Sequence, residues 1–100
     1  MRLRWTDQAR QDLLEIGRFI ARDKPETARR WVSHLRQRAR QAAQAPRSGR
    51  RVPEVDRDDV REILERGYRI VYRVLDAEVH VLTVFEGHRL LRLDEYGEED

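Results

Sequence analysis

The sequence contains no cysteine, a single methionine and a single lysine, and no apolar run that approaches the length of a membrane span. Without cysteine, disulfide bridges and thiolate metal sites are excluded. A helix that crosses a bilayer needs about 20 mostly apolar residues, and the residues that follow Met1 lack the apolar segment of a signal peptide. We therefore expect a cytoplasmic protein with no membrane partner.

Standard catalytic and cofactor signatures are also missing. The chain has no phosphate-binding loop, no dinucleotide-binding glycine pattern and no nucleophile elbow. Its three histidines, His34, His80 and His88, do not have the spacing of metal ligands. We therefore expect neither a metal nor another cofactor, and we expect ordinary surface or packing roles for His34 and His80.

Charge is plentiful but unevenly distributed. Charged residues make up 40% of the chain, and the net charge is only +2. Residues 1–51 contain 14 basic and 5 acidic side chains, a net charge of +9, whereas residues 52–100 contain 7 and 14, a net charge of −7. The basic half favours an acidic protein partner or a nucleic acid.

Apolar periodicity predicts a strand and two helices in the first half of this 100-residue chain. Leu3 and Trp5 alternate with arginines, as in a short strand with one buried face. Thr6 is a suitable N-cap for a helix over residues 7–21, and Pro25 suits the first turn of a second helix. The apolar stripe of this second helix comprises Ala28, Trp31, Val32, Leu35, Ala39 and Ala42, and Arg29, Arg36 and Arg40 are expected on its opposite side.

The second half changes to a period of two residues. Residues 60–65, 68–75 and 78–85 are predicted strands with two-residue connections, as in hairpins, and the charged stretch before them is a predicted loop. The fold class is therefore α+β: an N-terminal strand, a helical hairpin and a three-stranded antiparallel meander, with the helices packed on one face of the sheet. We expect residues 1–100 to form a single domain.

Two sets of polar residues within the strands and at their ends are candidates for a site. His88 and Arg89 follow a central strand, where they could supply proton transfer and phosphate neutralisation for RNA cleavage or could lie in a solvated turn. Arg69 and Arg73 alternate on one strand face. They are either covered by carboxylates such as Glu62 or form an anion-binding row with Arg61 and Arg89, because an unpaired buried arginine is too costly.

Three segments resemble a known family: residues 61–64 (Arg-Glu-Ile-Leu), 67–74 (Gly-Tyr-Arg-Ile-Val-Tyr-Arg-Val) and 79–89 (Val-His-Val-Leu-Thr-Val-Phe-Glu-Gly-His-Arg). They are similar to the core of the RelE/ParE superfamily of toxins from type II toxin–antitoxin modules, and the helical hairpin followed by Pro46 and Gly49 also fits. The resemblance implies a toxin that is held inactive by a cognate antitoxin, whose C-terminal segment wraps the helices and the sheet edge. Operator DNA is then contacted only through the antitoxin.

The RelE branch, which cuts mRNA in the ribosomal A site without a metal, is matched only in part. Its strand arginine corresponds to Arg69 and its later arginine to Arg89, and His88 could replace the missing base. Two lysines that act on the scissile phosphate correspond to Val60 and Glu62. The catalytic tyrosine corresponds to a position at or beside Glu95, next to Tyr96. A glutamate that faced an RNA phosphate would be repulsive.

The amino-acid sequences of the three segments resemble the ParE branch more closely, and this branch inhibits DNA gyrase. In a ParE-like protein, Glu62 can pair with Arg69 or Arg73. We therefore expect a ParE-like gyrase inhibitor, with a ribosome-dependent endoribonuclease and a non-toxic antitoxin-binding module as alternatives. The ribonuclease alternative would use Arg69, His88, Arg89 and Tyr96. Contacts with the antitoxin or target are expected from Arg29, Arg36, Arg40, Arg61, Arg69, Arg73 and Arg89.

Overall fold

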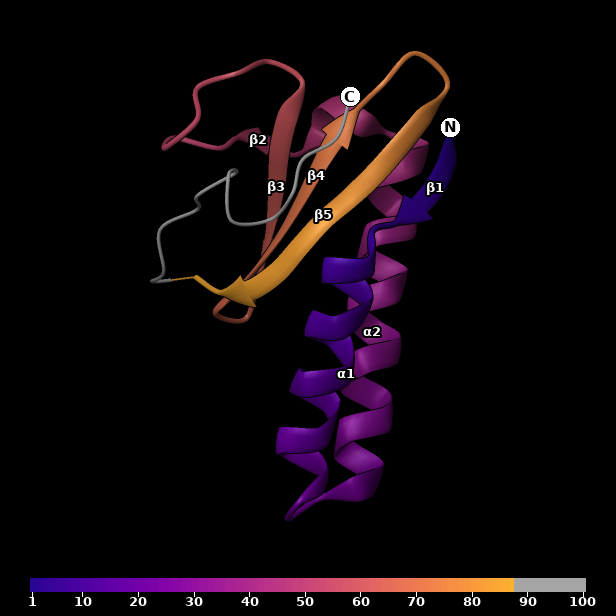
Figure 1. Cartoon of the computed structure of the whole chain (residues 1–100), viewed down its shortest axis with the longest axis vertical. Coiled ribbons are helices and arrows are strands. Elements are labelled where there is room, and N and C mark those ends of the chain that lie inside the picture. The colour runs from indigo at the N-terminus through magenta and orange to yellow at the C-terminus, as the bar shows by residue number, and fades with distance from the viewer. Residues whose placement is uncertain (88–100) are drawn as a thin grey trace.

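A computed structural model of the chain describes residues 1–87 and has the predicted α+β architecture (Figure 1). The elements are β1 (Arg2–Trp5), α1 (Asp7–Ala21), α2 (Pro25–Gln44), a 3₁₀ turn (Pro46–Ser48), β2 (Arg50–Arg51), β3 (Val60–Glu65), β4 (Tyr68–Val74) and β5 (Glu78–Glu86). The predicted helices and strands are confirmed to within one or two residues at their ends. The short strand β2 was not predicted, because two exposed arginines carry no apolar alternation.

The five strands form one sheet in the order β1-β5-β4-β3-β2. β1 pairs with β5 in parallel and every other neighbouring pair is antiparallel. A parallel pair requires a long crossover connection. In this chain the connection from β1 to β5 contains the helical hairpin and strands β2 to β4. Figure 1 shows the hairpin beside the sheet, with its turn extending beyond the sheet's end.

The helices bury their apolar stripes against one sheet face. Ala9 and Leu13 from α1 and Leu35 from α2 pack with Ile70 and Tyr72 of β4 in the larger of two cores. Each fully buried large aliphatic side chain contributes about 1.5–3 kcal/mol relative to an exposed one. This core therefore fixes the hairpin on the sheet.

The first turn of α1 is also anchored to the edge of β5. The Thr6 hydroxyl donates to the carbonyl oxygens of Val81 and Leu82, each at 3.0 Å, and accepts from the amide of Ala9 as an N-cap. Farther along, the Asp12 carboxylate accepts hydrogen bonds from the hydroxyl of Thr83 and the amide of the next residue. Helix α1 thus satisfies polar groups of β5 where its neighbour β1 has ended.

The opposite sheet face has a smaller core of its own. Val60, Val71, Leu82 and Phe85 are covered there by residues 52–59, which contribute Val52 and Val55. β5 has one extra residue at Leu82, between the pairs Val71↔Thr83 and Tyr72↔Val81. This bulge changes which side chains point to which face. The predicted loop is therefore a packed segment that follows the sheet face opposite the helices.

A buried tyrosine holds the chain that leads from α2 into this segment. The Tyr72 hydroxyl donates to the carbonyl oxygen of Pro46 at 2.7 Å and accepts from the amide of Gly49 at 3.1 Å. A Cβ atom at Gly49 would collide with this hydroxyl and with the backbone of Glu62. The position therefore requires glycine for the close approach of β4.

Within residues 1–87, neither helix combines the length and apolar character needed to span a bilayer.

Candidate functional site

A chain of ion pairs lies on the sheet face opposite the helices, and its centre is Arg69 of β4. The Arg69 Nε atom donates to Glu62 Oε1 at 2.6 Å, and its two terminal nitrogens donate to Glu54 at 2.6 and 2.7 Å. Its guanidinium carbon lies 5.2 Å from the centre of the Phe85 ring. The side chain is only 5% exposed. Arg69 is thus held by two carboxylates and an aromatic ring.

Glu62 is the most enclosed charge of this group, with a side chain that is 0% exposed. Its second oxygen accepts a hydrogen bond at 2.6 Å from Nε of Arg50, whose side chain is half exposed. Hydrogen bonds to Glu54 and then to Glu62 raise the pKa of the Arg69 guanidinium above its ordinary value, against the opposing effect of burial. The predicted pairing of Glu62 with a sheet arginine is confirmed, and Arg69 is its partner.

The second arginine of this face, Arg73, is also paired. Its Nε atom donates to Asp59 at 3.1 Å, and Arg57 donates to the same carboxylate at 2.7 and 3.0 Å. The hydrogen bond from Arg57 is the main reason that the pKa of Asp59 lies below its usual value. Residues 52–59 therefore supply carboxylates to both Arg69 and Arg73, which favours the first of the two alternatives drawn from the sequence.

Arg61 does not join this row. It alternates with Val60 and Glu62 along β3 and so points to the other side of the sheet. There it donates to the Asp58 carboxylate at 2.7 Å and to the carbonyl oxygen of Gly49 at 2.9 Å. The alternative of an anion-binding row is therefore not met by Arg61, Arg69 and Arg73. The remaining predicted site residues, His88, Arg89 and Tyr96, lie outside the described residues.

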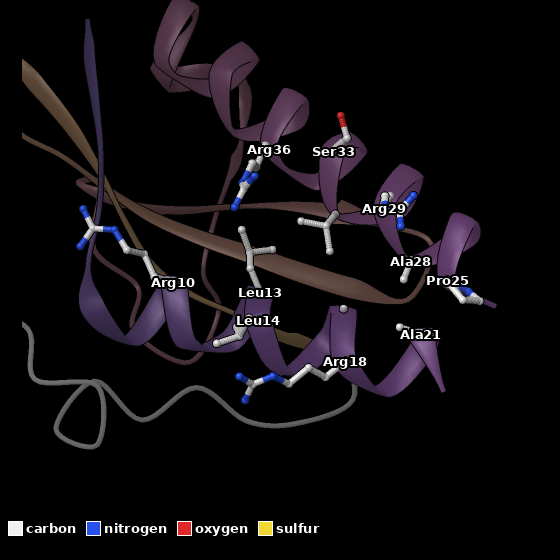
Figure 2. A pocket seen from close by; sticks show the side chains of 12 residues that line it. Arg10, Leu13, Leu14, Arg18, Ala21, Pro25, Ala28, Arg29, Ser33 and Arg36 are labelled. Atoms are coloured by element: carbon white, nitrogen blue, oxygen red, sulfur yellow. The ribbon is translucent and has the colours of Figure 1, made fainter. Parts of the chain in front are cut away.

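A second candidate site is an apolar groove between α1 and α2 with a volume of about 570 Å³. Leu13, Leu14 and Gly17 come from α1, and Ala28 and Val32 come from α2 (Figure 2). Leu14 is 48% exposed. Four arginines also line the groove, namely Arg10, Arg18, Arg29 and Arg36. The groove thus combines an apolar floor with a cationic rim.

The structure divides the predicted arginine stripe of α2. Arg36 lines the groove, Arg29 borders both the groove and the outer surface of the helix, and Arg40 lies with Arg30 on that outer surface. The sequence analysis did not predict this groove. The pattern that could have indicated it is Leu14, an apolar residue outside the main stripe of α1 with an arginine four residues away on each side.

Two histidines lie within hydrogen-bonding distance of glutamates. His34 Nε2 lies 2.7 Å from Glu65, whose other oxygen accepts from Nε of Arg38 at 2.9 Å. The hydrogen bond with His34 is the main reason that the pKa of Glu65 lies below its usual value. His80 Nε2 lies 2.8 Å from Glu78 on the same strand. Both histidines thus have structural partners, and within residues 1–87 no three His, Asp or Glu side chains could hold a metal together.

A comparison with known protein families places nearly the whole chain in one of them. Residues 3–91 match the family described as the ParE toxin of the type II toxin–antitoxin system parDE. A putative toxin, Y4kP, from Sinorhizobium fredii (strain NBRC 101917 / NGR234) is 35% identical over 92 residues, which cover 88% of this chain and 90% of that protein.

Two solved toxin–antitoxin structures share the fold. The chromosomal ParDE system from P. aeruginosa aligns with a TM-score of 0.73 and 27% identity over 86% of this chain and 95% of that one. The RelBE2 complex from Mycobacterium tuberculosis aligns with a TM-score of 0.62 and 23% identity over 85% and 95%, which supports the fold alone. The chain therefore belongs to the ParE toxin family of type II toxin–antitoxin systems.

Proposed function

We propose that this ParE-family toxin inhibits DNA gyrase and is neutralised by a cognate antitoxin. The observation that carries the choice of target is the enclosure of Arg69 by Glu54 and Glu62. Arg69 is the described residue that a RelE-like ribonuclease would use on RNA. Here all three of its nitrogens already donate to carboxylates.

An RNA phosphate at this position would have to displace Glu54 and would then face the buried carboxylate of Glu62. Two like unit charges about 4 Å apart repel each other by roughly 4 kcal/mol at an effective dielectric constant near 20. This repulsion opposes the phosphate contact that the ribonuclease mechanism needs. The same contacts are well explained as structural, because they connect residues 52–59 to β3 and β4.

The groove between α1 and α2 suits the antitoxin. An amphipathic helix buries its apolar face in such a groove, and Leu14 already exposes apolar surface there. The four rim arginines would pair with acidic side chains on the flanks of that helix. The ParDE toxin–antitoxin system from P. aeruginosa among the structural relatives supports this choice of partner.

Gyrase inhibition can be tested with the purified full-length chain, relaxed plasmid and gyrase. We expect loss of supercoiling and accumulation of cleaved DNA, and prior addition of the antitoxin should prevent both effects. Unchanged supercoiling at several-fold molar excess of folded protein would refute the proposed target. Message cut in a translation extract, and lost on His88→Ala or Arg89→Ala substitution, would instead establish the ribonuclease.

The non-toxic alternative is tested by expression without the antitoxin. We expect growth arrest with filamentation and a DNA-damage response, as gyrase poisoning produces broken DNA. Unimpaired growth of cells that contain soluble, folded protein would show that the chain only binds its antitoxin.

A further inference from the structure

The outer surface of α2 is strongly basic. Between Thr27 and Gln44 the helix contains five arginines and no aspartate or glutamate. Arg29, Arg30, Ser33, Gln37 and Arg40, called here the α2 basic face, line a shallow depression together with His34. All five side chains of this face are on exposed residues. The depression is distinct from the groove between the two helices, although Arg29 and Ser33 border both.

Few carboxylates neutralise this surface. Glu26 pairs with Arg29 at one end of the face. Within residues 1–87, no carboxylate pairs with Arg30 or Arg40, and the Nε and Nη2 atoms of Arg40 donate to the uncharged Gln37 at 3.2 and 3.0 Å. His34 is already bound to Glu65 of β3. Within the part of the chain that the structure describes, Arg30 and Arg40 are therefore exposed cations without a carboxylate partner.

The spacing of these side chains follows one side of the helix. Arg29, Ser33, Gln37 and Arg40 are separated by four, four and three residues, so they form a single row. Eleven residues of α-helix rise about 16 Å. One strand of duplex DNA presents a phosphate about every 3.4 Å along its axis, so the row can lie along several consecutive phosphates.

We propose that the α2 basic face binds the phosphodiester backbone of nucleic acid without reading its sequence. Arginine, serine and glutamine side chains are common phosphate ligands, and guanidinium groups bind phosphate oxygens in a bidentate manner. No apolar side chain lines this depression, in contrast to the groove that exposes Leu14. An acidic amphipathic helix would therefore find no apolar contact here, and phosphate is the better ligand. The toxin itself then contacts nucleic acid, in addition to contacts made through the antitoxin.

The test measures binding of the full-length chain to a labelled random-sequence DNA duplex of about 20 base pairs, by fluorescence anisotropy between roughly 50 and 200 mM salt. Three phosphate contacts, from Arg29, Arg30 and Arg40, predict a slope of log K against log salt of about −2.7, or about a 40-fold loss of affinity over this range. Arg30→Gln and Arg40→Gln should each reduce the magnitude of the slope by about 0.9. Arg2→Gln removes the same charge from an exposed site on β1 and should leave the slope unchanged.

Several outcomes would overturn the proposal. One is a slope of log K against log salt that falls as much in Arg2→Gln as in Arg30→Gln and Arg40→Gln, which would show that binding depends on net charge alone. Another is no measurable binding at the lowest salt, and a third is equally tight binding of an acidic peptide of matched charge. Single-stranded RNA in place of the duplex would support the proposal with a shallower slope of about −0.7 per contact. The assay contains neither gyrase nor antitoxin, so its failure would leave the proposed target intact, and circular dichroism confirms that each variant is folded.

Discussion

The enclosure of Arg69 predicts that this arginine stabilises the fold rather than performs chemistry. Replacing it with methionine leaves Glu62, whose side chain is 0% exposed, with Arg50 as its remaining cation. Breaking a buried ion pair by removing one partner costs about 3–5 kcal/mol. For a domain of this size, that loss lowers the Tm by at least about 12 °C. We therefore expect Arg69→Met to be strongly destabilised.

A double variant separates the burial of an unpaired charge from the loss of packing. Replacing a buried ion pair with apolar residues of similar volume is often neutral. Glu62→Leu combined with Arg69→Met should therefore recover most of the stability lost in Arg69→Met, with a coupling energy above about 2 kcal/mol. The recovered protein should also still inhibit gyrase, because Arg69 has no catalytic task in the proposed function.

Reversible urea unfolding measures these free energies, with Trp5 and Trp31 as fluorescent reporters that pack against the larger core. Arg51→Met is the matched control, since Arg51 is half exposed on β2 and pairs with the exposed Asp56. It should change stability by less than about 0.5 kcal/mol. A loss below about 1 kcal/mol in Arg69→Met, or a double variant no more stable than the single one, would contradict the assignment of Arg69 as a structural residue.

Three further predictions concern other contacts. Tyr72→Phe should cost about 1–3 kcal/mol in the free energy of unfolding, because the amide of Gly49 loses its acceptor; a loss within experimental error in urea unfolding would be inconsistent with this contact. Glu65→Gln should lose about 1–2 kcal/mol at neutral pH. The lowered pKa of Glu65 in the folded state gives stability that is present above its unfolded value near 4.5 and is lost as the pH falls through the lower, folded pKa. The two unfolding curves should therefore converge in acid, and a difference that persists there would contradict a charge-dependent contact of Glu65 with His34 and Arg38. Leu14→Arg should leave the Tm nearly unchanged but weaken antitoxin binding at least tenfold in calorimetry, and unaltered affinity would place the antitoxin elsewhere.

The helices and main strands could be predicted from the sequence because their signals are local. The apolar spacing of α1 and α2, the N-cap at Thr6 and the two-residue turns each depend on neighbouring residues alone. The Arg66–Gly67 turn has positive φ at both residues, 48° and 87°, as a tight hairpin between two alternating strands requires. The segments of β3, β4 and β5 that resemble the family could be recognised for the same reason, because each is a continuous stretch of sequence.

The candidate sites depended on contacts that no local pattern records. The alternation of Arg69 and Arg73 determined that carboxylates or an anion must meet them, because buried arginines cannot remain unpaired. Only the tertiary structure decided between these, by folding residues 52–59 over the sheet so that Glu54 and Asp59 reach the two arginines. The groove between α1 and α2 likewise exists only once the two helices pack side by side. Composition and periodicity therefore determined which groups must be paired or buried, whereas long-range packing selected their partners.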